Sequence, residues 1–316
     1  MTAAAHPSRH RTLSGIGLTL LAVLCFASLD SCVKHLSGFL PMLVVVWVRY
    51  ALQALIMGVW LGWRAGGRHF RVKHPRFQVL RGALLLSTSA LAFYGLKYMP
   101  MAEFTSVVML APVLVTLMAP FLLGEHVSPA RWALVILALA GALIIVRPGS
   151  GLFGAAALFP LLVALASAGF QVLTSRMSSL ESPMTTHFYT GAVGTVLMSG
   201  ALLVSPVELA PVLTQASAGQ WGLMVLAGVF GTLGHLAFIH ALGRAPMGVL
   251  MPFTYAQIAF AATLGGIFFA HVPDSWALIG MGVIAASGAT SVWLNTRAAP
   301  HHRAPASVVA ADTMAE

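Results

Sequence analysis

LAFYGLKYMPM (residues 91–101) returns in the second half of the chain as LAFIHALGRAPM (236–247), with one residue inserted. All matched positions, including two shorter ones, lie 144 to 146 residues apart. Leu- and Ala-rich segments give single matches by chance, but an ordered series at one spacing is much harder to obtain that way. We therefore interpret the chain as a tandem repeat. The shorter matches keep the same order: HV at 126–127 and 271–272, and WAL at 132–134 and 276–278.

The composition places both copies of the repeat in a membrane. Of the 316 residues, 59% are hydrophobic and 8% are charged, whereas a soluble domain is about 25% charged. The apolar runs between charges fit membrane helices of roughly 20 residues. These runs are continuous rather than alternating, which favours helices over a β-barrel. Gaps and turn signals predict ten helices, at about 13–34, 42–63, 79–97, 102–123, 130–147, 152–175, 184–205, 219–242, 247–270 and 275–295.

Each copy contains five of these helices, so the expected fold is an all-α integral membrane protein with repeats over 13–147 and 152–295. An odd number of helices makes the second copy cross the membrane in the opposite sense, and such inverted repeats are the architecture of secondary transporters. A cytoplasmic N-terminus puts thirteen of the 17 Lys and Arg residues on the cytoplasmic side, as the positive-inside rule expects. Both termini are then cytoplasmic, with an N-terminal segment over 1–12 and a disordered tail over 296–316.

The charge pattern also limits the expected partners. The net charge of +9 is explained by loops such as RAGGRHFRVKHPR (64–76), which we interpret as a topology signal facing anionic lipid and not as a nucleic-acid site. No Walker A, HExxH or CxxC motif occurs, so no cofactor and no metal site are expected. Cys25 and Cys32 stand about 10 Å apart along one helix and cannot form a disulfide. The expected partners are the bilayer and a small-molecule substrate; a coupling proton and a homodimer stay open.

The segment LAPVLVTLMAPFLLGEHVSPARWALVILALAGALIIV (110–146) resembles EamA-type members of the drug/metabolite transporter superfamily. The resemblance extends over about residues 13–295. It implies a bundle in which the first four helices of each copy surround a central cavity and the fifth packs behind it. It also implies that the two halves rock to open the cavity to each side alternately. The matching elements are Pro112, Glu125, Trp132 and Gly141.

The second copy departs from this pattern at two positions. Ala270 stands where the first copy has Glu125, and Gln257 stands where it has Pro112. A symmetric role for paired glutamates is therefore in doubt. The alternative for Glu125 is a structural role in the cytoplasmic loop, with Arg131 as its partner.

FASLDSCVKHL (26–36) carries Asp30 and Lys34 inside an apolar run. The next helix runs back and places Arg49 at a similar depth, about 10 Å along from Pro41. Ionisable residues within a span are costly and by default functional. One hypothesis is that the three groups form an external gate or substrate site, in which Asp30 binds an amine or a proton and Arg49 holds a carboxylate. The alternative is that Asp30 and Arg49 neutralise each other while Lys34 snorkels to the headgroups.

Other polar residues within the predicted helices are candidates for lining the path. A lone His or Tyr more commonly makes an interhelical hydrogen bond, although His235 and His240 could titrate near neutral pH and couple protons. The predicted substrate-binding or gating set is Asp30, Arg49, Tyr94, Gln171, His235, His240, Tyr255 and Gln257. Weaker candidates are Tyr98, Thr105, His187 and Thr254.

These features predict a secondary transporter of the bacterial inner membrane, more readily an exporter than an importer, that moves small polar or amphiphilic metabolites by alternating access. An amino-acid-like zwitterion suits the paired opposite charges. The alternative is an integral-membrane transferase acting on a lipid-linked or acyl substrate. Such an enzyme should cluster carboxylates or His beside a nucleophile, whereas the 8 acidic residues here are dispersed singly, so no catalytic residue is expected. A receptor or scaffold is disfavoured by the inverted repeat.

Overall fold

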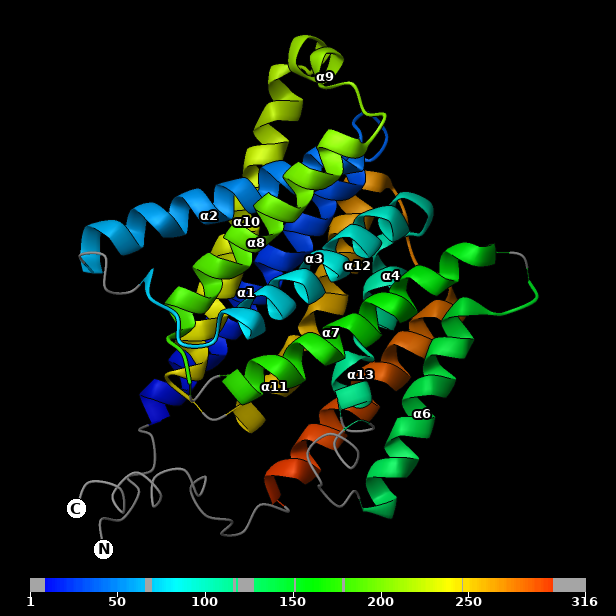
Figure 1. The fold of residues 1–316 in the computed structure, drawn as a ribbon. Coiled ribbons are helices and arrows are strands. Elements are labelled where there is room, and N and C mark those ends of the chain that lie inside the picture. Colours follow the sequence, from blue (N-terminus) through cyan, green and yellow to red (C-terminus); the bar gives the residue numbers. More distant parts are fainter. Residues whose placement is uncertain are drawn as a thin grey trace, which may run out of the picture.

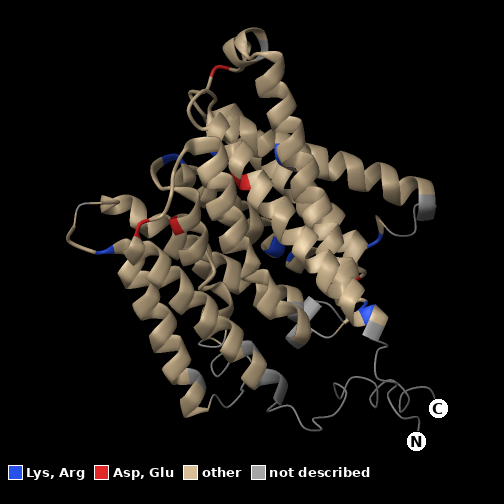
Figure 2. Ribbon diagram, turned by 180° about the vertical axis from the view of Figure 1, so that it is seen from behind, with Lys and Arg blue, Asp and Glu red and all other residues tan. Residues whose placement is uncertain are grey.

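The computed structural model describes residues 9–65, 70–115, 118, 128–150, 152–177, 180–245 and 247–297. Within these residues the chain forms helices and turns, without a β-strand. In the part of the chain that the structure describes, seven helices are long and apolar enough to cross a membrane, and three shorter apolar helices accompany them. Figure 2 shows that long stretches of the helices carry no Lys, Arg, Asp or Glu. The described chain is thus built as a helical, multi-pass membrane protein.

Each of the ten predicted ranges contains a helix (Figure 1). In the first half these are α1 (Arg9–Leu36), α2 (Met42–Ala65), α3 (Pro75–Tyr98), α4 (Met101–Val108) and α6 (Pro129–Val146). The second half contains the 3₁₀ turn η2 (Gly154–Ala157), α7 (Leu158–Met177), α8 (Pro183–Val204), α9 (Leu209–Gln215), α10 (Ala218–Leu242), α11 (Met247–Thr254), α12 (Ala256–Phe269) and α13 (Ser275–Arg297), of which α9 lies outside the predicted ranges.

The start of α1 and the loop after α8 differ from the predicted helices, and two predicted features lie outside the described residues. α1 begins at Arg9, so the last residues of the expected N-terminal segment are helical. α9 is a short helix that the sequence did not predict. Pro206 and Pro211 give its segment the appearance of a turn in the sequence. The predicted disordered tail from residue 298 onward and Glu125 lie outside the described residues.

Two of the predicted helices are interrupted rather than continuous. In the first half, Met109 and Leu110 form a turn, and the helix resumes at 111. Pro112 explains this turn, because proline lacks an N–H and its ring clashes with the carbonyl four residues earlier. In the second half, Tyr255 separates α11 from α12, three residues after Pro252. Leu110 and Tyr255 are 145 residues apart, which is the spacing of the sequence repeat.

Helices of the two halves pack against each other in matched pairs. α1 packs along α10, as α3 packs along α7. α2 contacts α10 and α8, while α8 contacts α3 and α2. α6 and α13, the last helices of the two halves, lie side by side at one edge (Figure 1). The core between α1, α2, α3, α7, α8 and α10 therefore consists of side chains from both halves.

Small residues let α8 approach α2 closely. A Cβ at Gly191 would lie 2.7 Å from the backbone nitrogen of Ala54, and a Cβ at Gly194 would overlap the Tyr50 ring. Such small residues permit backbone contact between helices in membranes. The approach brings the polar residues of α2 against those of α8.

Replacing Gly191 with Ala is expected to lower the free energy of unfolding by about 1–3 kcal/mol, because the new methyl overpacks the α2–α8 contact. Gly200, on the same helix, has nothing within 4 Å of its Cβ position. Gly200→Ala should therefore be neutral or slightly stabilising, as Ala favours a helix over Gly by up to about 1 kcal/mol. Unfolding of the two purified variants in detergent tests this. Equal stabilities would show that the close approach is not a constraint.

Candidate functional site

Polar side chains gather inside the bundle where α1, α2, α3, α8 and α10 meet, joined by α7 and α12. They come from both halves of the chain and most are buried. We call this group the core polar cluster. Its members are Asp30, Arg49, Tyr50, Gln53, Gln78, Arg81, Ser89, Thr174, Thr186, His187, Thr190, His235 and Gln257.

Arg49 is the central cation of the core polar cluster. Its side chain on α2 is 3% exposed, and Nη1 donates to the Ser89 hydroxyl at 2.9 Å. The guanidinium carbon lies 4.7 Å from the centre of the Tyr50 ring, whose hydroxyl also bonds Ser89 at 2.9 Å. Nε is buried without a hydrogen-bond partner. A buried cation held only by neutral groups is costly, which makes this position a candidate for binding an anion.

Asp30 on α1 is the acidic member of the cluster. Its carboxylate faces the Gln257 side chain of α12 and lies within electrostatic range of Arg49. The two charged groups do not form a direct ion pair. Each charge is therefore held by a neutral partner, Asp30 by Gln257 and Arg49 by Ser89, with the opposite charge nearby but not in contact.

Arg81 is a second buried cation, which the sequence analysis assigned to the cytoplasmic side. Its side chain on α3 is 9% exposed. Nε donates to the Thr174 hydroxyl at 2.8 Å, and Nη1 donates to the Thr190 hydroxyl and, at 3.4 Å, to the carbonyl of Thr186. Arg81 also lies near the start of α3, so a role as a cytoplasmic topology signal under the positive-inside rule stays open. The hydroxyls that bind it come from α7 and α8, about a hundred residues away in sequence.

Two imidazoles, those of His187 and His235, belong to the same cluster as the arginines. Gln53 Nε2 donates to the carbonyl of His187 at 3.0 Å and faces Nδ1 of the same residue at 3.3 Å. Nδ1 therefore accepts, and the ring proton of neutral His187 sits on Nε2, which is buried near the Thr232 carbonyl but makes no hydrogen bond of good geometry. The His187 and His235 ring centres are 5.3 Å apart. Both guanidinium groups lie within electrostatic range of these rings.

The other predicted residues lie elsewhere. Tyr94 is 43% exposed on α3, and His240 is exposed near the end of α10. Tyr255 is buried against Gly288 of α13, in the hydrophobic cluster that includes α6. Gln171 is half-buried on α7. Of the predicted set, the structure brings Asp30, Arg49, His235 and Gln257 together.

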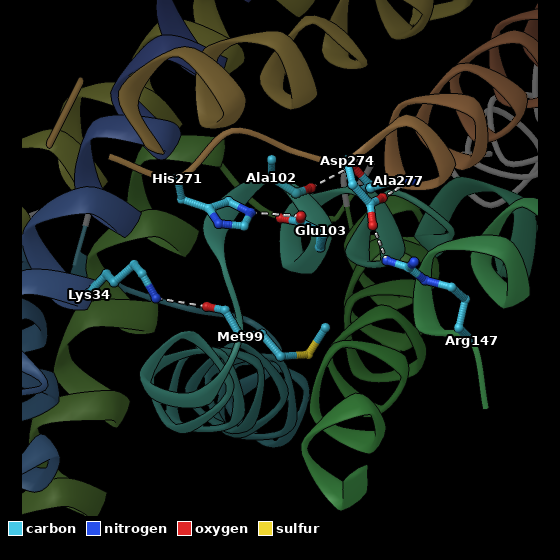
Figure 3. Close-up of polar contacts among 9 residues, drawn as sticks. Lys34, Met99, Ala102, Glu103, Arg147, His271, Asp274 and Ala277 are labelled. Carbon is cyan, nitrogen blue, oxygen red and sulfur yellow. Dashed lines mark hydrogen bonds and ion pairs between the residues drawn. The ribbon is translucent and has the colours of Figure 1, made fainter. Parts of the chain in front are cut away.

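A separate polar group lies where α1 ends, and it contains Lys34 (Figure 3). Lys34 Nζ donates to the carbonyls of Leu96 and Met99 at 2.8 Å each. The hypothesis that Lys34 meets Asp30 and Arg49 is therefore wrong, because its ammonium group is bonded to these carbonyls instead. The carbonyls at a helix C-terminus lack partners within the helix and attract a cation, and the end of α3 lies within reach of this side chain.

Glu103, in the first turn of α4, completes this group. Its side chain is 5% exposed, and Oε1 lies 2.8 Å from Nε2 of His271, in the segment between α12 and α13. Oε2 is buried without a partner, and Lys34 lies within electrostatic range. Nearby, Arg147 pairs with Asp274 at 2.6 Å (Figure 3). Glu103 was not among the predicted residues, because an acidic residue in the first turn commonly stabilises a helix through its dipole.

A multi-pass helical bundle with buried, unpaired charges at the junction of its two halves is the make-up of a transporter for a polar solute. The model of the EamA-like transporter family matches residues 13–147 and again 154–293. The chain belongs to this family, within the drug/metabolite transporters. Family membership makes it a transporter and excludes the transferase alternative.

Several relatives carry substrate names. The pseudopaline exporter CntI of Pseudomonas aeruginosa is 27% identical over 268 residues, which cover 84% of this chain and 92% of the relative. A riboflavin transporter of Vibrio cholerae is 27% identical over 88% of this chain and 93% of its own length. An S-adenosylmethionine uptake transporter of Rickettsia felis is 23% identical over 86% and 90%. A crystal structure with 19% identity has the same fold, with a TM-score of 0.65 over 91% of this chain and 99% of the solved chain.

Proposed function

We propose that the protein is a secondary transporter of the bacterial inner membrane that exports small polar or amphiphilic metabolites related to amino acids. The observation that carries this proposal is the separation of Asp30 from Arg49. Each is held by a neutral group, and the two do not pair directly. Two nearby opposite charges without mutual contact can receive a zwitterion, whose amine binds the carboxylate and whose carboxylate binds the guanidinium.

The physical alternative is a structural ion pair. A buried pair compensates its desolvation only through close contact and good geometry, and this pair lacks the contact. The charges are kept in the bundle at a cost to stability, which is typical of residues that bind a substrate or an ion. Asp30 is also the group in the cluster suited to carry a coupling proton.

Alternating access is supported by the symmetry of the two halves. The helix breaks at Leu110 and Tyr255 are separated by the repeat spacing. The α1–α10 contact is matched by α7–α3. Interrupted helices at corresponding positions of two repeats are typical of transporters whose halves rock about a central site. Inverted repeats with both termini in the cytoplasm fit this arrangement, and export agrees with the name of one relative.

Export is tested by comparing metabolites in the cytosol and medium of cells that express wild-type protein, Arg49→Gln or no protein. We expect one or more amino-acid-like compounds to leave the cytosol when wild-type protein is expressed and to stay there when no protein is expressed. Efflux per membrane-inserted molecule should fall at least tenfold in Arg49→Gln, because the substrate loses one charge-assisted bond.

Arg244→Gln is the matched control, because Arg244 is exposed and, among the described residues, its side chain bonds the carbonyl of His240 alone. It should export at the wild-type rate. Depletion of a compound from the medium would reverse the proposed direction. Equal efflux by wild type and Arg49→Gln would remove Arg49 from the site.

A further inference from the structure

We propose that the core polar cluster binds a substrate with two acidic groups and one amine, and that Arg81 and His187 form the position for the second acidic group. This inference rests on the proposed function and adds to it the charge of the substrate. The first acidic group would lie at Arg49, and the amine at Asp30 and Gln257.

The first argument is the charge of the cluster. Arg49 and Arg81 contribute two positive charges; among the described carboxylates Asp30 lies within electrostatic range of Arg49, and Arg81 has no carboxylate partner. A simple zwitterion would leave one buried positive charge unbalanced, whereas an amine with two acidic groups carries one net negative charge and balances the cluster. The other described carboxylates are engaged or exposed: Glu103 bonds His271, Glu181 bonds the amides of Lys73 and His74, Asp274 bonds Arg147, and Glu208 is exposed.

Second, buried donors in the cluster lack well-formed hydrogen bonds within the protein. Nε of Arg49 is a buried N–H donor that makes no hydrogen bond, and Nε2 of His187 is a second buried donor, which lies near the Thr232 carbonyl but outside good hydrogen-bond geometry. Buried donors without acceptors are costly, so a ligand that brings acceptor oxygens satisfies them. A carboxylate or a phosphate does so. The third such atom in the cluster is Oε1 of Gln78, an acceptor that suits a hydroxyl or amine of the same ligand.

The third argument is the way Arg81 is held. The Thr174 and Thr190 hydroxyls that accept from Arg81 donate their own protons to the carbonyls of Phe170 and Thr186. They fix the guanidinium without neutralising it. The Phe170 ring packs 4.5 Å from the guanidinium carbon. Arg81 is thus positioned and still charged, as an anion-binding arginine should be.

The inference is tested with purified full-length protein by thermal unfolding at constant ionic strength. The probes are two matched pairs: L-glutamate with L-glutamine, and O-phosphoserine with serine. Each pair differs by one acidic group. We expect millimolar glutamate or phosphoserine to raise the midpoint by about 5 °C at saturation, and its neutral partner to raise it much less. A glutamate effect identifies a carboxylate, and an effect of phosphoserine alone identifies a phosphate.

The variant Arg81→Gln should abolish the preference for the acidic probe, and Arg244→Gln should keep it. If Arg81→Gln fails to fold, Arg81→Lys keeps the charge but loses the planar fork, and a weakened preference is expected. Equal shifts within each pair, or no shift with either acidic probe, would overturn the inference. Binding with this preference but no export would overturn the proposed function alone, and export unaffected by Arg81→Lys would overturn the inference alone.

Discussion

Asp30→Asn is expected to lower the free energy of unfolding by about 2–4 kcal/mol, and the double variant Asp30→Asn/Arg49→Gln to recover most of that loss. Two unit charges a few ångströms beyond contact attract by about 2–3 kcal/mol at the effective dielectric constant of a protein. Removing Asp30 leaves Arg49 as a buried cation without compensation. Chemical unfolding of the two single variants and the double variant in detergent gives the coupling energy of the pair.

Transport should not follow stability in this set. In the double variant the substrate amine and the substrate carboxylate each lose a charge-assisted bond worth about 1.5–3 kcal/mol. The export rate should therefore fall by roughly a hundredfold or more. The pair Arg147 and Asp274 is the control. These residues form a direct but exposed ion pair, and the matching double variant should show little coupling and normal export. If Asp30→Asn/Arg49→Gln regains both stability and export, the two charges have only a structural role.

The helices could be predicted from the sequence because their signals are local. Apolar runs bounded by Pro, Gly and charged residues determine where each span lies, and Asp30 and Arg49 were found because charges within such runs are conspicuous. The breaks at Leu110 and Tyr255 were missed, since Pro112 and Pro252 fall within runs that are otherwise uniformly apolar. A proline in a membrane helix is compatible with either a continuous or an interrupted helix.

The partners of the buried groups could not be predicted in the same way. Arg81 was assigned to the cytoplasmic side, because nothing near it in sequence shows that α7 and α8 supply its hydroxyl acceptors. Lys34 was placed with Asp30 from helical spacing. The actual partners of Lys34 are the carbonyls of Leu96 and Met99 at the end of α3, which lie more than sixty residues away in sequence. Contacts of this kind depend on how helices pair, which a single sequence leaves open.

Glu103→Ala is expected to open the bundle at the end where α1 finishes. Glu103 on α4 binds His271 of the other half at 2.8 Å, and this contact must break whenever that end opens. Losing a charge-assisted bond worth about 1.5–3 kcal/mol should raise the open population roughly 10- to 100-fold. Cys32 is a native reporter, because it is buried in the same hydrophobic cluster as Met101 and Phe104. In a Cys25→Ser background, its labelling by a hydrophilic maleimide should accelerate by that factor.

Glu181→Ala is the matched control, since it removes a similar contact at the opposite end. Its side chain is 4% exposed and accepts from the backbone amides of Lys73 and His74, just before α3. Because α3 is 24 residues long, these contacts lie roughly 36 Å from Lys34 and Met99. If the two ends open alternately, Glu181→Ala should leave Cys32 labelling unchanged or slower. Equal acceleration by both variants would indicate general loosening of the bundle, and no acceleration in Glu103→Ala would show that the Glu103–His271 contact does not hold this end closed.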